Sequence, residues 1–170
     1  MKKFELTSEF VTFLGKTLFR IKALVSFGDV AEGELGGFIE RENNLDQSGD
    51  AWVYGDAQVF GDARVYGDAR VYGDAQVYGD AWVFGDARVY GDARVQNCRD
   101  YSATSCFGSE NRTTTFFRTK DGGISVRCGC FYGTLREFRE KVKERHGDSR
   151  LAKEYLMLAD LMEFRLSKDE

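Results

Sequence analysis

The side chains that could carry nucleophilic or metal chemistry are few in this chain. It contains one histidine, His146, and four cysteines, Cys98, Cys106, Cys128 and Cys130. A typical zinc site uses pairs of cysteines separated by two residues, or cysteines combined with several histidines, and this spacing offers neither. Cys128 and Cys130 are too close for an easy mutual disulfide, so we interpret the cysteines as reduced thiols of a cytosolic protein. We expect no metal and no cofactor.

Carboxylates, in contrast, recur at a fixed interval. The unit Gly-Asp-Ala-x-Val-aromatic runs eight times from Gly49 to Gln96, and only the last unit lacks its aromatic residue. Calcium-binding β-rolls repeat every nine residues with paired glycines, so a period of six with one glycine does not predict a calcium site. We expect these aspartates to bond to nearby backbone amides at corners of the chain. They are Asp50, Asp56, Asp62, Asp68, Asp74, Asp80, Asp86 and Asp92.

The same unit predicts the architecture that positions these carboxylates. Ala and Val lie two residues apart, so they share one face of a short strand, and the residue between them points away. Gly-Asp then makes a turn, because glycine accepts backbone angles that other residues avoid. Units of this length bury their apolar face only by stacking on one another, which predicts a solenoid.

The repeat resembles the hexapeptide-repeat family of left-handed parallel β-helices. That family places an aliphatic residue at one position and a small residue four positions later, as Val53 and Ala57 do here. The resemblance implies three hexads per coil, so that residues 18 apart stack at the strand spacing of about 4.8 Å. One departure is that tyrosine or phenylalanine follows the valine here, where the family often has Gly, Ala, Glu or Asp.

The segments that flank the repeat complete the expected fold. We predict an N-terminal cap over residues 1–48, the solenoid over 49–96, a polar connection over 97–112 and a C-terminal unit over 113–170. The C-terminal unit should contain a hairpin that turns at Lys120–Gly123 and two helices that begin near Thr134 and Ser149. The fold class is mainly β: a left-handed parallel β-helix with an N-terminal strand cap and a C-terminal β-hairpin plus two helices.

The apolar face of the second predicted helix is broader than one hairpin needs. We expect this face to pack against the end of the solenoid or to make a homo-oligomer. Its residues are Leu151, Tyr155, Leu158 and Met162.

The hexapeptide resemblance implies one enzymatic alternative, because many proteins of that family are acyltransferases with a catalytic histidine on a loop or coil edge. His146 lies outside the repeat, and no loop interrupts the eight units to build a substrate cleft. We therefore interpret His146 as the last residue of a helix, where it favours the helix dipole. We predict a protein that is not an enzyme; the alternative is an acyltransferase that uses the His146 of a neighbouring subunit.

The distribution of charge indicates the kind of partner. The chain has a net charge of −4, and the eight aspartates and four arginines of the repeat account for all of it. Direct binding of nucleic acid needs a basic face, so we do not expect it. Three carboxylates per coil amount to about one per 1.6 Å along the axis, close to the charge spacing of duplex DNA, although arginine offsets half of that charge. An acidic rod of this kind could occupy the basic channel of another protein.

The aromatic residues of the repeat should form ladders interleaved with arginine along the sides of the rod. Together with the aspartates they form the predicted binding surface. The candidate binding residues are Asp56, Asp62, Asp68, Asp74, Asp80, Asp86, Tyr54, Tyr72, Tyr90, Trp52 and Trp82.

Two further stretches extend the resemblance over nearly the whole chain. The segments 35–40 (LGGFIE) and 128–138 (CGCFYGTLREF), together with the hexads, look like small phage and prophage hexapeptide-repeat proteins. That resemblance implies an accessory protein that acts on a host system in the cytoplasm of the bacterial host. Our most concrete hypothesis is an inhibitor of a bacterial defence system, similar to an anti-CRISPR, that binds a host protein or nucleoprotein complex by nucleic-acid mimicry or steric occlusion. The alternative from another class is a structural or assembly protein that forms oligomers.

Neither a membrane span nor export is expected. No apolar run is long enough to cross a bilayer, and an acidic residue, Glu5, lies where a signal peptide needs an apolar stretch.

Overall fold

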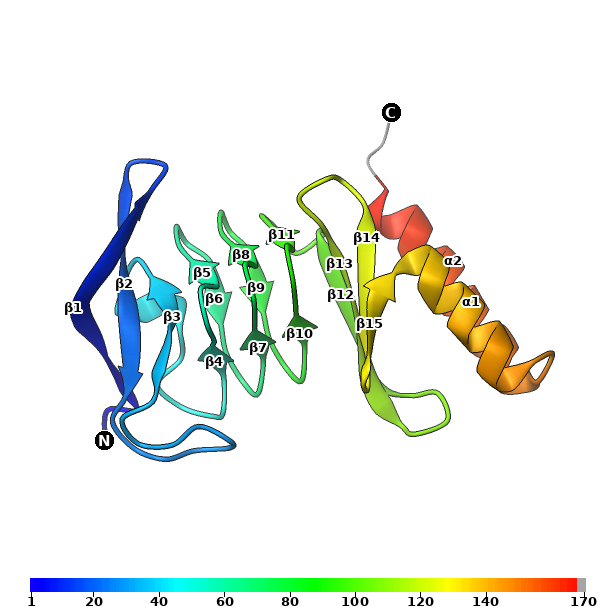
Figure 1. The fold of residues 1–170 in the computed structure, drawn as a ribbon, viewed down its shortest axis with the longest axis horizontal. Coiled ribbons are helices and arrows are strands. Elements are labelled where there is room, and N and C mark those ends of the chain that lie inside the picture. The colour runs from blue at the N-terminus through cyan, green and yellow to red at the C-terminus, as the bar shows by residue number, and fades with distance from the viewer. Residues whose placement is uncertain (168–170) are drawn as a thin grey trace.

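The computed structural model of the chain describes residues 1–167, which form a β-solenoid between a strand cap and an α/β unit (Figure 1). Eight strands of two residues each follow the repeat. They are β4 (Trp52–Val53), β5 (Gln58–Val59), β6 (Arg64–Val65), β7 (Arg70–Val71), β8 (Gln76–Val77), β9 (Trp82–Val83), β10 (Arg88–Val89) and β11 (Arg94–Val95).

Every third strand pairs in parallel, which gives the solenoid three sides. The sides are β4-β7-β10, β5-β8-β11 and β6-β9. Trp52 lies opposite Arg70, and Arg70 lies opposite Arg88, so residues 18 apart are stacked as the period predicts. The alanine and valine of every unit, from Ala51 to Val95, are completely buried. The β-solenoid and its core are therefore confirmed.

The corners of the coil are closed by the backbone and not by the aspartates. At the corner of Gly55, which has φ +60°, the amide of Ala57 donates to the carbonyl of Tyr54 at 3.2 Å. Glycine suits this position because φ is positive there. Among the side chains of the repeat aspartates in the described chain, only that of Asp68 accepts a bond from a backbone amide, that of Asp50 at 3.3 Å. The expectation that these carboxylates satisfy corner amides was wrong, because turns with a glycine bring the backbone groups together directly.

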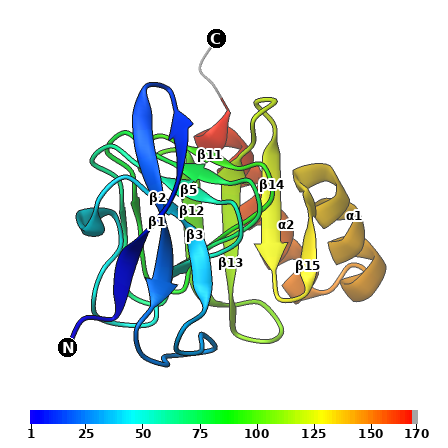
Figure 2. The same cartoon turned by 60° about the vertical axis from the view of Figure 1, so that its left-hand side comes forward.

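Three strands and a short helical turn cover the N-terminal end of the solenoid (Figures 1 and 2). They are β1 (Phe4–Phe13), β2 (Lys16–Ala23), β3 (Leu35–Ile39) and η1 (Glu42–Asn44). The antiparallel sheet β1-β2-β3 continues into the solenoid, because β3 pairs in parallel with β5. Gly37 permits this contact: a Cβ there would lie 2.5 Å from the carbonyl oxygen of Ala57.

Lys3 holds the first residues of the chain against the first corner of the solenoid through hydrogen bonds. Its buried amino group donates to the carbonyls of Ser48, Gly49 and Ala51 at 3.3, 3.2 and 3.0 Å. Burial lowers the pKa of Lys3 to about 8. The N-terminus is therefore part of the cap.

A four-stranded antiparallel sheet covers the other end of the solenoid. Its strands are β12 (Tyr101–Phe107), β13 (Arg112–Arg118), β14 (Ile124–Cys128) and β15 (Phe131–Thr134), in that order. The predicted hairpin is β13-β14, but β12 lies within 97–112, where we expected a polar connection. Tyr101 explains the difference: its ring is buried in the solenoid core, and its hydroxyl donates to the carbonyl of Trp82 at 2.6 Å.

Two helices pack on the face of this sheet that is turned away from the solenoid (Figure 1). They are α1 (Leu135–His146) and α2 (Arg150–Leu166), capped by the side chains of Thr134 and Ser149 as predicted. β13 serves both faces of the sheet, because Phe117 belongs to the solenoid core and Phe116 to the core of the helical unit. Neither helix of the described chain has the length and apolarity needed to cross a membrane.

The predicted oligomer face of α2 is largely used inside the chain. Tyr155 and Met162 are 5% exposed and pack in the helical core, and Leu151 and Leu158 are half-buried. This part of the prediction was wrong, because the sheet has four strands and therefore offers α2 more surface than a hairpin would. The apolar residues that α2 exposes are Met157, Leu161 and Phe164.

The corner glycines provide a matched test of the coil geometry. A Cβ on Gly79 would lie 2.4 Å from the carbonyl oxygen of Gln96, whereas one on Gly55 would meet nothing within 4 Å. We expect Gly55→Ala to lower the free energy of unfolding by about 1 kcal/mol, from the positive φ alone. Gly79→Ala should cost roughly 3 kcal/mol or more, because two backbone segments must move apart. Equal losses in urea titrations would contradict the stacking of coils described above.

Candidate functional site

The first side of the solenoid, β4-β7-β10, carries the predicted tyrosine ladder but is partly covered. The rings of Tyr54 and Tyr72 stack at 4.4 Å, and those of Tyr72 and Tyr90 at 4.3 Å. Asp29, from the loop after β2, accepts a hydrogen bond from the Tyr54 hydroxyl at 3.0 Å and forms an ion pair with Arg70. Burial raises the pKa of Asp29, but the bonds from Arg70 and Tyr54 outweigh it and hold that pKa below its usual range. The ladder is therefore confirmed, with its rings half-buried.

The second side, β5-β8-β11, lies partly under the β1-β2 hairpin. Phe60 is 4% exposed and packs with Leu18 and Phe38 of the cap. Its ring also stacks on Tyr78 at 5.2 Å. This side offers a partner little free apolar surface near the cap.

The third side, β6-β9, is open, and we call it the open side; it comprises Arg64, Tyr66, Trp82 and Phe84. Trp82 is 48% and Phe84 49% exposed. Tyr66 stacks on Phe84 at 5.3 Å and meets Trp82 edge-on at 6.3 Å. Trp82 also lines two hollows of about 560 and 480 Å³. Exposed aromatic rings held by stacking suit the contact of another protein.

Trp52 occupies the same position of the hexad as Trp82 but does not contribute to the surface. It is completely buried between the rings of Phe4 and Phe27, at 6.2 and 5.3 Å. Its selection as a binding residue was wrong, because the cap folds over the first coil at this position. Phe84 was not among the predicted binding residues, although it follows Tyr66 by 18 residues and the period therefore places it on the same side of the rod.

Columns of carboxylates flank the open side at its two corners. Asp62 and Asp80 follow one corner, and Asp68 and Asp86 the other. The cap neutralises one of these columns at its end, because Arg41 pairs with Asp62 at 2.8 Å. At the third corner of the coil, Arg20 pairs with Asp56 at 3.5 Å. Farther along the rod the carboxylates have no ion-pair partner within residues 1–167: Asp68, Asp74, Asp80, Asp86 and Asp92.

The coils match the YdcK β-solenoid repeat. The matched segments are residues 57–73, 63–79 and 87–98, so they lie on or directly after the repeat and cover less than a quarter of the chain. No curated protein matches the chain. The comparisons therefore support the solenoid and leave its activity open to proposal.

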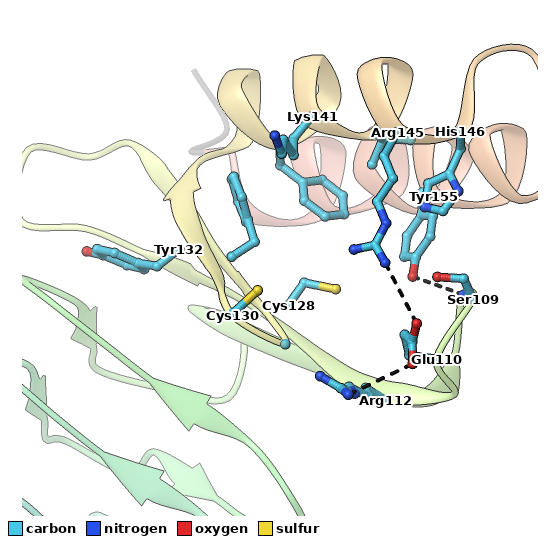
Figure 3. A pocket seen from close by; sticks show the side chains of 14 residues that line it. Ser109, Glu110, Arg112, Cys128, Cys130, Tyr132, Lys141, Arg145, His146 and Tyr155 are labelled. Atoms are coloured by element: carbon cyan, nitrogen blue, oxygen red, sulfur yellow. Dashed lines mark hydrogen bonds and ion pairs between the residues drawn. The ribbon is translucent and has the colours of Figure 1, made fainter.

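His146 and two of the cysteines come together elsewhere, at a cavity of the helical unit (Figure 3). His146 ends α1, as predicted, and its ring stacks on Tyr155 at 5.7 Å. Cys128 is half-buried at the end of β14, whereas Cys130 is exposed in the turn that follows. The two thiols do not share a strand, because β14 ends at Cys128. Among residues 1–167 no three His, Cys, Asp or Glu side chains gather as a metal-ligand set.

The two tryptophans of the repeat give a matched test of which surface is free. We expect Trp52→Ala to lower the free energy of unfolding by about 3–5 kcal/mol, because it leaves a cavity beneath the cap. Trp82→Ala should change it by less than about 1 kcal/mol, because nearly half of that side chain is already in water. Thermal and urea unfolding of both variants would measure the difference, and a large loss for Trp82→Ala would show that the open side is structural.

Proposed function

We propose that the chain is a non-enzymatic binding protein that docks its open side onto a basic, nucleic-acid-binding surface of a host complex. The observation that carries this proposal is the pair of carboxylate columns beside Trp82 and Phe84. Apart from Asp68, these aspartates accept no backbone amide bond among the described residues, and beyond the cap they have no ion-pair partner. The side chains of Asp80 and Asp86 are therefore available to a partner.

The carboxylate columns lower the stability of the folded chain, so a role in folding does not explain them and a role in binding does. Stacked carboxylates lie about 4.8 Å apart along each corner, and like charges at that distance repel. Such a field accelerates the approach of a basic surface and excludes acidic ones. Trp82 and Phe84 would then supply the desolvated anchors that dominate the affinity of protein interfaces.

The most concrete form of the proposal concerns a phage accessory protein. A rod whose two columns present about one carboxylate per 2.4 Å of its axis could fill the nucleic-acid channel of a defence complex, as an anti-CRISPR does, or block it sterically. Any host nucleoprotein with a basic groove would meet the same carboxylates and aromatic rings.

The proposal is tested by expressing the chain in bacteria with an active nucleic-acid-guided defence system and measuring the plating efficiency of a targeted phage. We expect the wild-type chain to raise plating. The triple change Asp68→Asn, Asp80→Asn and Asp86→Asn should remove most of this effect, and so should Trp82→Ala. No rise with the wild-type chain against a panel of such systems would contradict the inhibitor hypothesis.

A matched control separates the corner carboxylates from net charge. Glu5→Gln, Glu32→Gln and Asp148→Asn change the net charge by the same amount at exposed positions outside the solenoid. This control should keep full plating efficiency. The triple aspartate variant should also unfold at the same temperature as the wild type or a higher one, because repulsion along the columns is relieved. Equal loss in both triple variants would contradict a role for the columns.

Self-association is a second candidate function, favoured by the apolar face of α2. Met157, Leu161 and Phe164 are 71%, 57% and 86% exposed and follow one another at helical spacing. A single chain leaves this stripe in water, whereas a second copy would cover it.

Sedimentation velocity tests self-association. We expect the wild-type chain to form dimers or larger species as its concentration rises, and Leu161→Glu to remain monomeric because it places a charge in the stripe. Lys153→Gln, exposed on the same helix, serves as the control and should behave as the wild type. A monomeric wild-type chain at all concentrations would exclude the assembly function through α2.

A further inference from the structure

A cavity of about 370 Å³ lies in the helical unit, between α1, the turn that joins β14 to β15, and the loop that joins β12 to β13 (Figure 3). The open side contributes no residue to its lining. Its volume falls within the range of small-molecule sites, about 300–1,000 Å³. The cavity is therefore large enough for a ligand of its own.

One wall of the cavity is apolar. It is formed by Phe131, Phe138, Val142 and Tyr155. These residues belong to or pack against the core of the helical unit, and the rings of Phe131 and Phe138 lie 5.6 Å apart. Tyr155 is held in place because its hydroxyl accepts the amide of Ser109 at 3.2 Å. This wall is thus preorganised for the apolar body of a ligand.

The rim of the cavity carries two arginines that share one carboxylate. Arg112 and Arg145 line it with Glu110, and Lys141, which also lines it, is paired with Glu144 at 2.8 Å. The Arg145 guanidinium points from α1 toward Glu110 (Figure 3) and lies 3.7 Å from its carboxylate, and Arg112 lies 3.9 Å from it. Both contacts are longer than a charge-assisted hydrogen bond, which measures about 2.7–2.9 Å. The single carboxylate of Glu110 is therefore shared by two arginines at long distances, and the rim keeps a net positive charge.

We propose that this cavity binds a small organic anion, with its apolar body against the Phe131–Phe138 wall and its anionic group between Arg112 and Arg145. Guanidinium groups suit this role because they donate paired hydrogen bonds to carboxylate, phosphate or sulfonate oxygens. The anionic group would take over from Glu110 as the partner of the two arginines. The site requires neither metal nor covalent chemistry.

Two related fluorescent probes test the proposal. Anilinonaphthalene sulfonate carries an aromatic body and an anionic group, and N-phenylnaphthylamine has the same body without the charge. We expect the sulfonate to bind the wild-type chain about tenfold or more tightly than the neutral probe, as one or two charge-assisted contacts imply. Equal affinities would overturn the proposal.

Matched variants locate the charge that the probe meets. The pair Arg112→Gln and Arg145→Gln should weaken sulfonate binding about tenfold or more and leave the neutral probe within about twofold. Arg99→Gln with Arg136→Gln removes the same charge from exposed positions that do not line the cavity and should leave both probes unchanged. Equal weakening by the two pairs would show a general effect of charge and overturn the site.

The cysteines report where the probe lies. Cys130 is exposed and lines the cavity, whereas Cys106 is exposed and does not line it. Bound sulfonate should slow the alkylation of Cys130 by iodoacetamide severalfold, measured by peptide mass spectrometry, and leave Cys106 unaffected. Protection of neither thiol, together with loss of probe binding in Leu161→Glu, would place the probe on the exposed stripe of α2 and overturn the proposal.

Discussion

The ladder of backbone hydrogen bonds between coils 18 residues apart is the constraint on which the rest of the structure depends. Bonds such as that from the Gln58 amide to the Ala75 carbonyl, at 2.9 Å, hold each coil on the next. They require a small core residue on each strand and a positive φ at each corner, which alanine and glycine supply. Because every outward residue meets its counterpart one coil later, charges form columns and aromatic rings form stacks. The surface is thus a consequence of the ladder.

A ladder of this kind leaves unpaired backbone groups at its two ends, and both are occupied here. β3 continues one side at the N-terminal end, while at the other end Thr119 bridges Ala93 and the Thr115 hydroxyl accepts the amide of Arg88 at 3.0 Å. Exposed strand edges favour open-ended association, and these caps remove them along the axis. A partner of the kind proposed would therefore have to meet the sides of the rod or the helical unit.

The six-residue period predicted the features of the solenoid that depend on the repeat alone. It did not predict the features that depend on segments outside the repeat. It predicted the three sides, the buried Ala and Val and the stacked tyrosines, since each follows from the interval between units. It could not distinguish Trp52 from Trp82, because their burial depends on a cap that is distant in sequence. Nor did it reveal β12, which lies outside the repeat, or the basic cavity, whose Arg112 begins β13 and whose Arg145 belongs to α1.

In a regular repeat, specificity must come from the positions that break the pattern. Tryptophan replaces the usual Arg or Gln at Trp52 and Trp82, and phenylalanine replaces tyrosine at Phe60 and Phe84. The chain's own cap covers Trp52 and Phe60, where burial removes any use for a charge or a hydroxyl. Trp82 and Phe84 make the same exchanges on the one side that the cap leaves open, and they lie two residues apart. The repeat therefore changes its chemistry where its own cap covers an apolar surface and again on the open side, where Trp82 and Phe84 stay nearly half exposed and the proposed partner would cover them.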